Sequence, residues 1–112
     1  MTLNHLTLAV PEIGPTKEFL ERYFGLQDNG HSRTNIAFLI DDKGLVLTLI
    51  KAKDAVYPAF FHIGFIQESE AKVDEINQRM KDDGLEVGSP ERSHGYTFYV
   101  KAPGGFLVEV FG

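Results

Sequence analysis

The sequence contains no cysteine, no long hydrophobic run and no cluster of basic residues. Without cysteine there are no disulfide bonds, thiolate nucleophiles or cysteine-based metal sites, so a bound metal ion must use histidine, aspartate, glutamate or water. No apolar run approaches the roughly 18 residues that span a bilayer. A formal net charge of −5 argues against binding to nucleic acid phosphates or anionic membranes. We therefore expect a cytoplasmic protein with a small-molecule ligand and no nucleic-acid or membrane partner.

What the chain does contain is an internal repeat. Each half opens with a histidine in a short apolar strand, His5 in the first half and His62 in the second. A helical pattern follows in each half, and the closing element is a glycine followed by another apolar strand. Alignment of the closing strands places Glu109 of the second half where the first half has Thr48. The repeat predicts two copies of one structural module.

The expected fold class is α+β, with two tandem βαβββ modules at residues 1–52 and 58–112. At 112 residues and 43% hydrophobic content, the chain suits a single compact domain. Apolar residues at helical spacing predict one helix from Gly14 that is stopped by Gly25, and a second that is capped by Ser69 and ended by Gly84. Strands are expected near residues 3–10, 26–30, 34–40 and 44–51 in the first module, and near 60–66, 85–88, 96–101 and 105–111 in the second.

Three residues of metal-ligand type occupy matched places in the two modules. By strand alternation, His5 shares a face with Thr7, and His62 shares a face with Gly64, so small neighbours leave room around each imidazole. Glu109 lies in an otherwise apolar strand, where a carboxylate needs a cationic, hydrogen-bonding or metal partner. Two imidazoles and one carboxylate leave open coordination positions and suit Fe, Mn or Zn.

Two modules with these strands resemble the vicinal oxygen chelate superfamily, which includes glyoxalase I, extradiol dioxygenases, fosfomycin-resistance thiol transferases and bleomycin-resistance proteins. The resemblance covers residues 3–112. It implies a cup-shaped, partly open mixed β-sheet and a homodimer, which many members build by exchanging modules. It also implies a divalent metal ion, with Fe, Mn, Ni and Zn all open, held by His5, His62 and Glu109. The fourth ligand position of glyoxalase I falls on Thr48, a poor metal ligand.

The resemblance further implies which residues contact substrate. Tyr99 matches a cavity tyrosine that can donate a hydrogen bond to a substrate oxyanion. In glyoxalase I a metal-ligating glutamate can act as the base, and this role falls on Glu109, so Tyr99 and Glu109 are the expected catalytic residues. The anion-binding lysine of the thiol transferases falls on Ser89, which makes fosfomycin itself a doubtful substrate. The expected substrate-binding residues are Thr7, Thr48, Ser93, Thr97 and Tyr99.

Two functions remain open at this point. The first is a metal-dependent enzyme of glyoxalase, thiol-transferase or dioxygenase type, in which the metal acts as a Lewis acid on a small oxygen-bearing substrate. The alternative is a metal-free protein of the bleomycin-resistance type that sequesters a small molecule, with Phe60 and Phe61 lining its pocket. His94 is either a proton carrier or an exposed loop histidine, and His31 is expected to be an exposed loop histidine.

Overall fold

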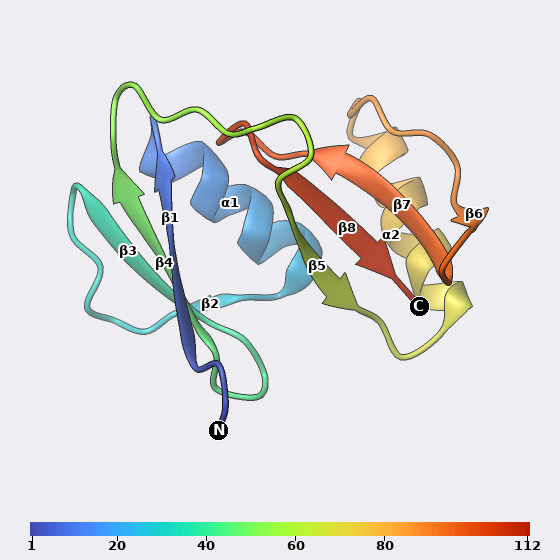
Figure 1. The fold of residues 1–112 in the computed structure, drawn as a ribbon, viewed down its shortest axis with the longest axis horizontal. Helices are drawn as coiled ribbons and strands as arrows, with labels where there is room; N and C mark the ends of the chain where they lie inside the picture. Colours follow the sequence, from blue (N-terminus) through green and yellow to red (C-terminus); the bar gives the residue numbers. More distant parts are fainter. The chain divides into compact units, whose positions relative to one another are not determined.

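The computed structural model describes all 112 residues and divides the chain into two compact units. The first unit comprises residues 1–56 and 103–105, and the second comprises residues 57–102 and 106–112. Each unit holds one four-stranded mixed sheet and one long helix, in the order strand, helix, strand, strand, strand (Figure 1). The prediction of an α+β fold built from two βαβββ repeats is confirmed.

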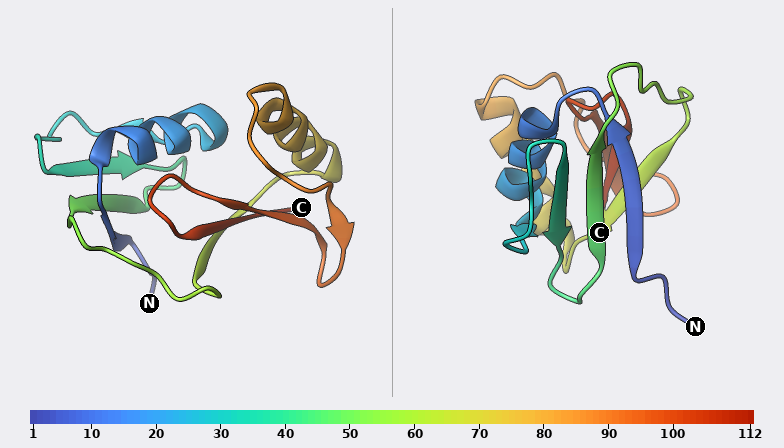
Figure 2. Two further views of the ribbon diagram at one scale, coloured as in Figure 1. Left: turned by 90° about the horizontal axis from the view of Figure 1, so that it is seen from above. Right: turned by 90° about the vertical axis from the view of Figure 1, so that its left-hand side faces the viewer.

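The first unit runs from the amino terminus through five elements. Its sheet has the strand order β1-β4-β3-β2, with β1 parallel to β4 and the other pairs antiparallel. Figure 2 shows the helix lying along one face of this sheet. The elements are β1 (His5–Val10), α1 (Ile13–Phe24), β2 (Gln27–Asp28), β3 (Ile36–Ile40) and β4 (Val46–Lys51).

Alternation along β1 sorts its side chains as predicted. Leu8 and Val10 are buried, whereas His5 and Thr7 are exposed on the opposite face. α1 buries an apolar stripe against the sheet and ends at Gly25, whose φ of 68° is the left-handed conformation that glycine adopts without strain. The apolar faces of β1 and α1 therefore form the core, and the histidine face of β1 is left outside it.

The second unit repeats this arrangement. Its sheet has the order β5-β8-β7-β6, with β5 parallel to β8 and the other pairs antiparallel. Neither its helix nor α1 has the length and apolar character needed to cross a membrane. The elements are β5 (His62–Ile66), α2 (Glu70–Asp82), β6 (Glu91–Arg92), β7 (Tyr96–Lys101) and β8 (Leu107–Phe111).

α2 begins where the sequence predicted. The Ser69 hydroxyl accepts a hydrogen bond from the Lys72 backbone N–H at 3.2 Å, which satisfies one of the free donors of the first turn. Val73, Ile76 and Met80 are buried on one stripe of the helix, as their spacing predicted.

The strand predicted near residues 85–88 is wrong. The Leu85 N–H donates to the Met80 carbonyl at 2.9 Å, and the buried Asn77 side chain donates to the Gly88 carbonyl at 2.8 Å. These bonds tie the segment to α2 instead of to a neighbouring strand. The edge strand β6 forms later, at Glu91–Arg92.

Strand register confirms the internal repeat residue by residue. In the first unit Thr7 of β1 lies opposite Thr48 of β4, and in the second unit Gly64 of β5 lies opposite Glu109 of β8. Thr7 and Gly64 each lie two residues beyond the opening histidine of their unit. Glu109 therefore occupies the position that Thr48 occupies in the first unit.

Candidate functional site

Glu109 lies at the centre of the polar cluster in the second unit. Its strand, β8, runs between β5 and β7, so the residue has Gly64 on one side and Tyr99 on the other. Its neighbours Val108 and Val110 are fully buried on the opposite face. Glu109 itself is only 8% exposed, so its carboxylate depends on the groups around it for solvation.

The two oxygens of this carboxylate have different surroundings. Oε2 accepts a hydrogen bond from the Thr97 hydroxyl at 2.7 Å and lies 2.5 Å from His94 Nε2, whereas Oε1 lies 3.7 Å from His62 Nε2. Burial raises the pKa of Glu109, but the hydrogen bonds from Thr97, His94 and Tyr99 outweigh burial and bring its pKa below the usual value. The carboxylate is therefore ionised at neutral pH.

His62 presents a nitrogen lone pair to this carboxylate. Its Nδ1 lies 3.1 Å from the Phe60 carbonyl, and because a carbonyl only accepts, Nδ1 carries the hydrogen. In the neutral ring Nε2 then carries the lone pair, and this nitrogen faces Glu109 Oε1 at 3.7 Å. Two lone-pair atoms at this separation repel unless a proton or cation lies between them, and a backbone carbonyl behind the ring is the usual support of a metal-binding histidine.

Tyr99 borders the same cluster. Its ring meets the His62 ring edge to face, with centroids 5.4 Å apart. Burial, together with its hydrogen bond to Glu109, raises the pKa of the Tyr99 hydroxyl. The hydroxyl therefore stays protonated at neutral pH and can act as a hydrogen-bond donor.

The predicted residues of the first unit have a similar local arrangement. His5 Nδ1 lies 2.6 Å from the Asn4 side-chain oxygen, so Nδ1 carries a hydrogen and, in the neutral ring, Nε2 carries the lone pair, as in His62. Thr7 is exposed and Thr48 is buried. The structure contains no group of three or more His, Asp or Glu side chains arranged to hold a metal ion. It does bring together two of the three predicted ligands, His62 and Glu109.

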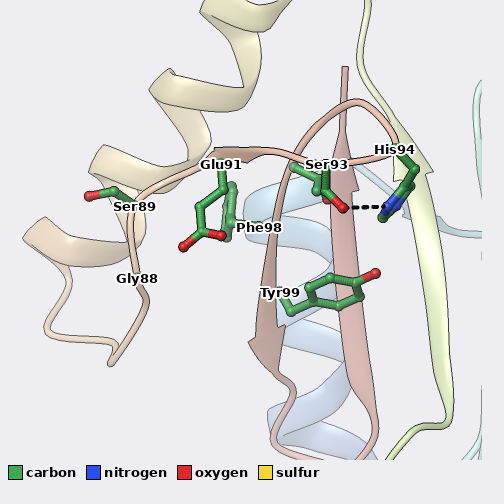
Figure 3. A pocket seen from close by; sticks show the side chains of 8 residues that line it. Gly88, Ser89, Glu91, Ser93, His94, Phe98 and Tyr99 are labelled. Atoms are coloured by element: carbon green, nitrogen blue, oxygen red, sulfur yellow. Dashed lines mark hydrogen bonds between the residues drawn. The ribbon is translucent and has the colours of Figure 1, made fainter.

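A pocket of about 340 Å³ is lined by His94 and Tyr99, two of the residues that hydrogen-bond Glu109 (Figure 3). The predicted substrate-binding residues Ser93, Thr97 and Tyr99 all line it. No lysine or arginine does so, and Glu91 adds a carboxylate to its wall. The remaining lining residues are Gly88, Ser89 and Phe98.

The structure makes His94 part of the cluster, a role that the sequence left open. The residue lies in the loop between β6 and β7, outside any alternating pattern, so no periodicity could have shown its direction. Its ring stacks on Phe111 with centroids 5.6 Å apart. His31, in contrast, lies in an exposed loop, as predicted.

Gly95 allows this loop to approach β8, and replacement by alanine is expected to disturb it. A Cβ at Gly95 would lie 2.2 Å from the Phe111 ring, which must then move and take the stacked His94 with it. We expect G95A to lose about 1–3 kcal/mol of unfolding free energy, as for other overpacked sites. Urea unfolding measures this loss. Gly88→Ala is the control, because a Cβ there meets no atom within 4 Å; equal losses in both variants would contradict the prediction.

Comparison with known proteins identifies the family of this chain. The family model of the Glyoxalase/Bleomycin resistance protein/Dioxygenase superfamily matches residues 2–110. The chain belongs to this superfamily. The predicted resemblance is thus confirmed, and Glu109, His62 and Tyr99 can be compared with the sites of other members.

Three members illustrate the range of relatives. Glutathione transferase FosA from Serratia marcescens is 27% identical over 112 residues, which cover 97% of this chain and 79% of FosA. The structure of a possible glyoxalase from Bacillus cereus has a TM-score of 0.95 at 49% identity, covering 100% of this chain and 99% of the other. A variant of the fosfomycin resistance protein FosX from Listeria monocytogenes, solved with Mn(II) and 1S,2S-dihydroxypropylphosphonic acid, is 26% identical with a TM-score of 0.82, covering 98% and 90%.

Proposed function

We propose that this protein is a divalent-metal-dependent enzyme in which His62 and Glu109 hold the ion and His5 supplies a third ligand. The observation that carries the proposal is that His62 Nε2, the ring nitrogen not bonded to the Phe60 carbonyl, faces the Glu109 carboxylate at 3.7 Å. His5 would come from the same chain or, in a homodimer with exchanged modules, from a second copy. Its free Nε2, fixed by Asn4, supports this role.

The donor set fits several first-row ions. Two imidazoles and one carboxylate with open positions suit Fe, Mn, Ni or Zn, and such ligands select weakly among them. Mn(II) in the structure of the FosX variant makes Mn(II) the first ion to test. When bound, the ion would supply Lewis-acid stabilisation of negative charge developing on the oxygens of a small substrate.

The surrounding side chains would bind the substrate as hydrogen-bond donors or acceptors. The neutral Tyr99 hydroxyl would shift its hydrogen bond from Glu109 to a substrate oxygen as charge develops on that oxygen. The Thr97 hydroxyl already donates to Glu109, so towards a substrate its oxygen can only accept. Ser93 also lines the pocket, and while its hydroxyl donates to His94 its oxygen can accept from a substrate. In the first unit, Thr7 and Thr48 are proposed as further contacts with the substrate.

The charge of the pocket favours a neutral polar substrate over a dianion. No lysine or arginine lines the wall, the Lys81 ammonium is engaged with the wall residue Ser89 at 3.0 Å, and the carboxylate of Glu91 would repel a phosphonate. We therefore propose that fosfomycin, the compound named for the FosX relative, is a poor substrate here. The reaction is proposed only as a class, in which an oxyanion or enediolate of a small oxygen-bearing compound is stabilised.

Metal content is the direct test. Protein purified without chelator or added metal is expected to contain near-stoichiometric Fe, Mn, Ni or Zn by elemental analysis, and His62→Ala is expected to lose most of it. If the wild-type protein is empty, Mn²⁺ at 100 times its dissociation constant should still add about 2.7 kcal/mol to the unfolding free energy. A wild-type protein that is empty and gains nothing from any of the four ions contradicts the proposal.

That negative result would favour a metal-free binding protein. A second pocket of about 300 Å³, lined by Phe60, His62, Tyr99 and Leu107, supports this second candidate, because its wall is largely apolar. Phe60 is 80% exposed there. A small aromatic compound that raises the melting temperature without any metal would identify the protein as a sequestering one.

A further inference from the structure

We propose that His94 is a positioning residue that holds Glu109 so that only Oε1 is available to the metal ion. This inference rests on the proposed metal-binding function and assigns His94 a place in it. His94 lies outside the three predicted ligands, in the loop between β6 and β7. Its effect would be exerted through the Glu109 carboxylate and not by contact with the ion.

The hydrogen bonds at Oε2 carry the proposal. His94 Nε2 lies 2.5 Å from this oxygen, and the Thr97 hydroxyl lies 2.7 Å from it. A carboxylate oxygen has two lone-pair sites, so these two donors engage both sites of Oε2. Oε1 is then the oxygen left to face His62 at 3.7 Å and to accept from Tyr99, which still leaves it one lone-pair site. The arrangement predicts monodentate binding of the metal by Glu109.

The His94 ring is held in place although 53% of its side chain is exposed. One face stacks on Phe111, with the rings inclined by 15°. Nδ1 lies 3.3 Å from the Ser93 hydroxyl, which can donate to it and so leave the ring hydrogen on Nε2. The loop itself is closed by a bond from the Ser93 N–H to the Gly95 carbonyl at 2.8 Å. The ring is thus a preorganised donor towards Glu109.

Direct metal binding by His94 is a different role with a different signature. At 2.5 Å from Oε2 its Nε2 is engaged in a hydrogen bond to the carboxylate. A positioning residue can be replaced by another donor of similar reach, whereas a ligand cannot. Glutamine places an amide N–H close to the position of the imidazole Nε2, so His94→Gln separates the two roles.

The experiment is a Mn²⁺ titration of the full chain, with free Mn²⁺ followed by electron paramagnetic resonance. Outer-shell residues commonly contribute 10–100-fold to metal affinity, so H94A is expected to weaken Mn²⁺ binding by about 10–100-fold. H94Q is expected to recover most of that loss. His31→Ala, which removes an exposed loop histidine, is the matched control and should bind as the wild-type protein does. Thermal melts of each metal-free variant check that all of them are folded.

Each other outcome overturns the inference in a recognisable way. If the wild-type protein binds Mn²⁺ and H94A binds equally well, His94 does not position Glu109, and the proposed function stands. If both H94A and H94Q lose binding as completely as H62A, His94 is a ligand and not a positioning residue. If the wild-type protein and H62A both fail to bind, the proposed function and this inference fail together.

Discussion

Replacing Glu109 by glutamine is expected to lower Mn²⁺ affinity more than any other single change at the site, well beyond the 10–100-fold typical of outer-shell residues. The substitution removes the charge that attracts the ion while keeping the size of the side chain. It also replaces the carboxylate that accepts hydrogen bonds at Oε2 from Thr97 and His94 in the wild-type protein by an amide. If the amide nitrogen of the new glutamine takes the place of Oε2, it faces the hydrogen-bond donors of Thr97 and His94, so that three donor groups meet.

The measurement is the same Mn²⁺ titration, with Glu91→Gln as the matched control. Glu91 lines the same pocket, so E91Q removes an equal charge nearby without touching the strand ladder of β8. We expect E91Q to stay within about threefold of the wild-type affinity, as exposed charges act weakly through water. Equal losses in E109Q and E91Q would mean that the ion responds to net charge only and is not held by Glu109.

Truncation of Phe106 to alanine is expected to cause the largest loss of stability. Phe106 is fully buried in the second unit, and the Tyr57 ring packs against it edge on, with centroids 5.7 Å apart. Removal of a buried phenylalanine ring leaves a cavity and commonly costs about 3–5 kcal/mol. That is a large part of the 5–15 kcal/mol by which domains are stable, so F106A should be partly unfolded at 37 °C.

Urea unfolding followed by circular dichroism measures this loss, and Phe60→Ala is its control. Phe60 is the same residue type at 80% exposure, and surface substitutions usually change stability by no more than about 0.5 kcal/mol. A loss below about 1 kcal/mol in F106A would show that the second unit contributes little to the measured transition.

Much of the fold was predictable because successive side chains of a strand point to opposite faces of the sheet. Once each half was aligned on its histidine, alternation fixed which residues share a face, and the pairing of Gly64 with Glu109 follows the same register as that of Thr7 with Thr48. The candidate ligands lie on strands, so their directions could be inferred. His62 and Glu109 do meet, and Tyr99 lies beside them.

The parts that sequence did not reveal depend on side-chain bonds across long separations. Residues 85–88 alternate as a strand does, but the Asn77 amide holds the Gly88 carbonyl against α2. Asn77 looks like an ordinary polar helix residue until its burial is known. His94 is similar, since its direction is set by Ser93, Phe111 and Glu109 and not by any repeating pattern.

The short edge strand β6 has a consequence for how this protein can change. It pairs through only two residues, and the pocket loop around it contributes little to the ladder formed by β5, β8 and β7. Mutations in residues 88–92 can therefore alter which compounds fit while the strands bearing His62 and Glu109 keep their register. Natural variation and directed evolution both have a route to new substrates here that leaves the reactive centre in place.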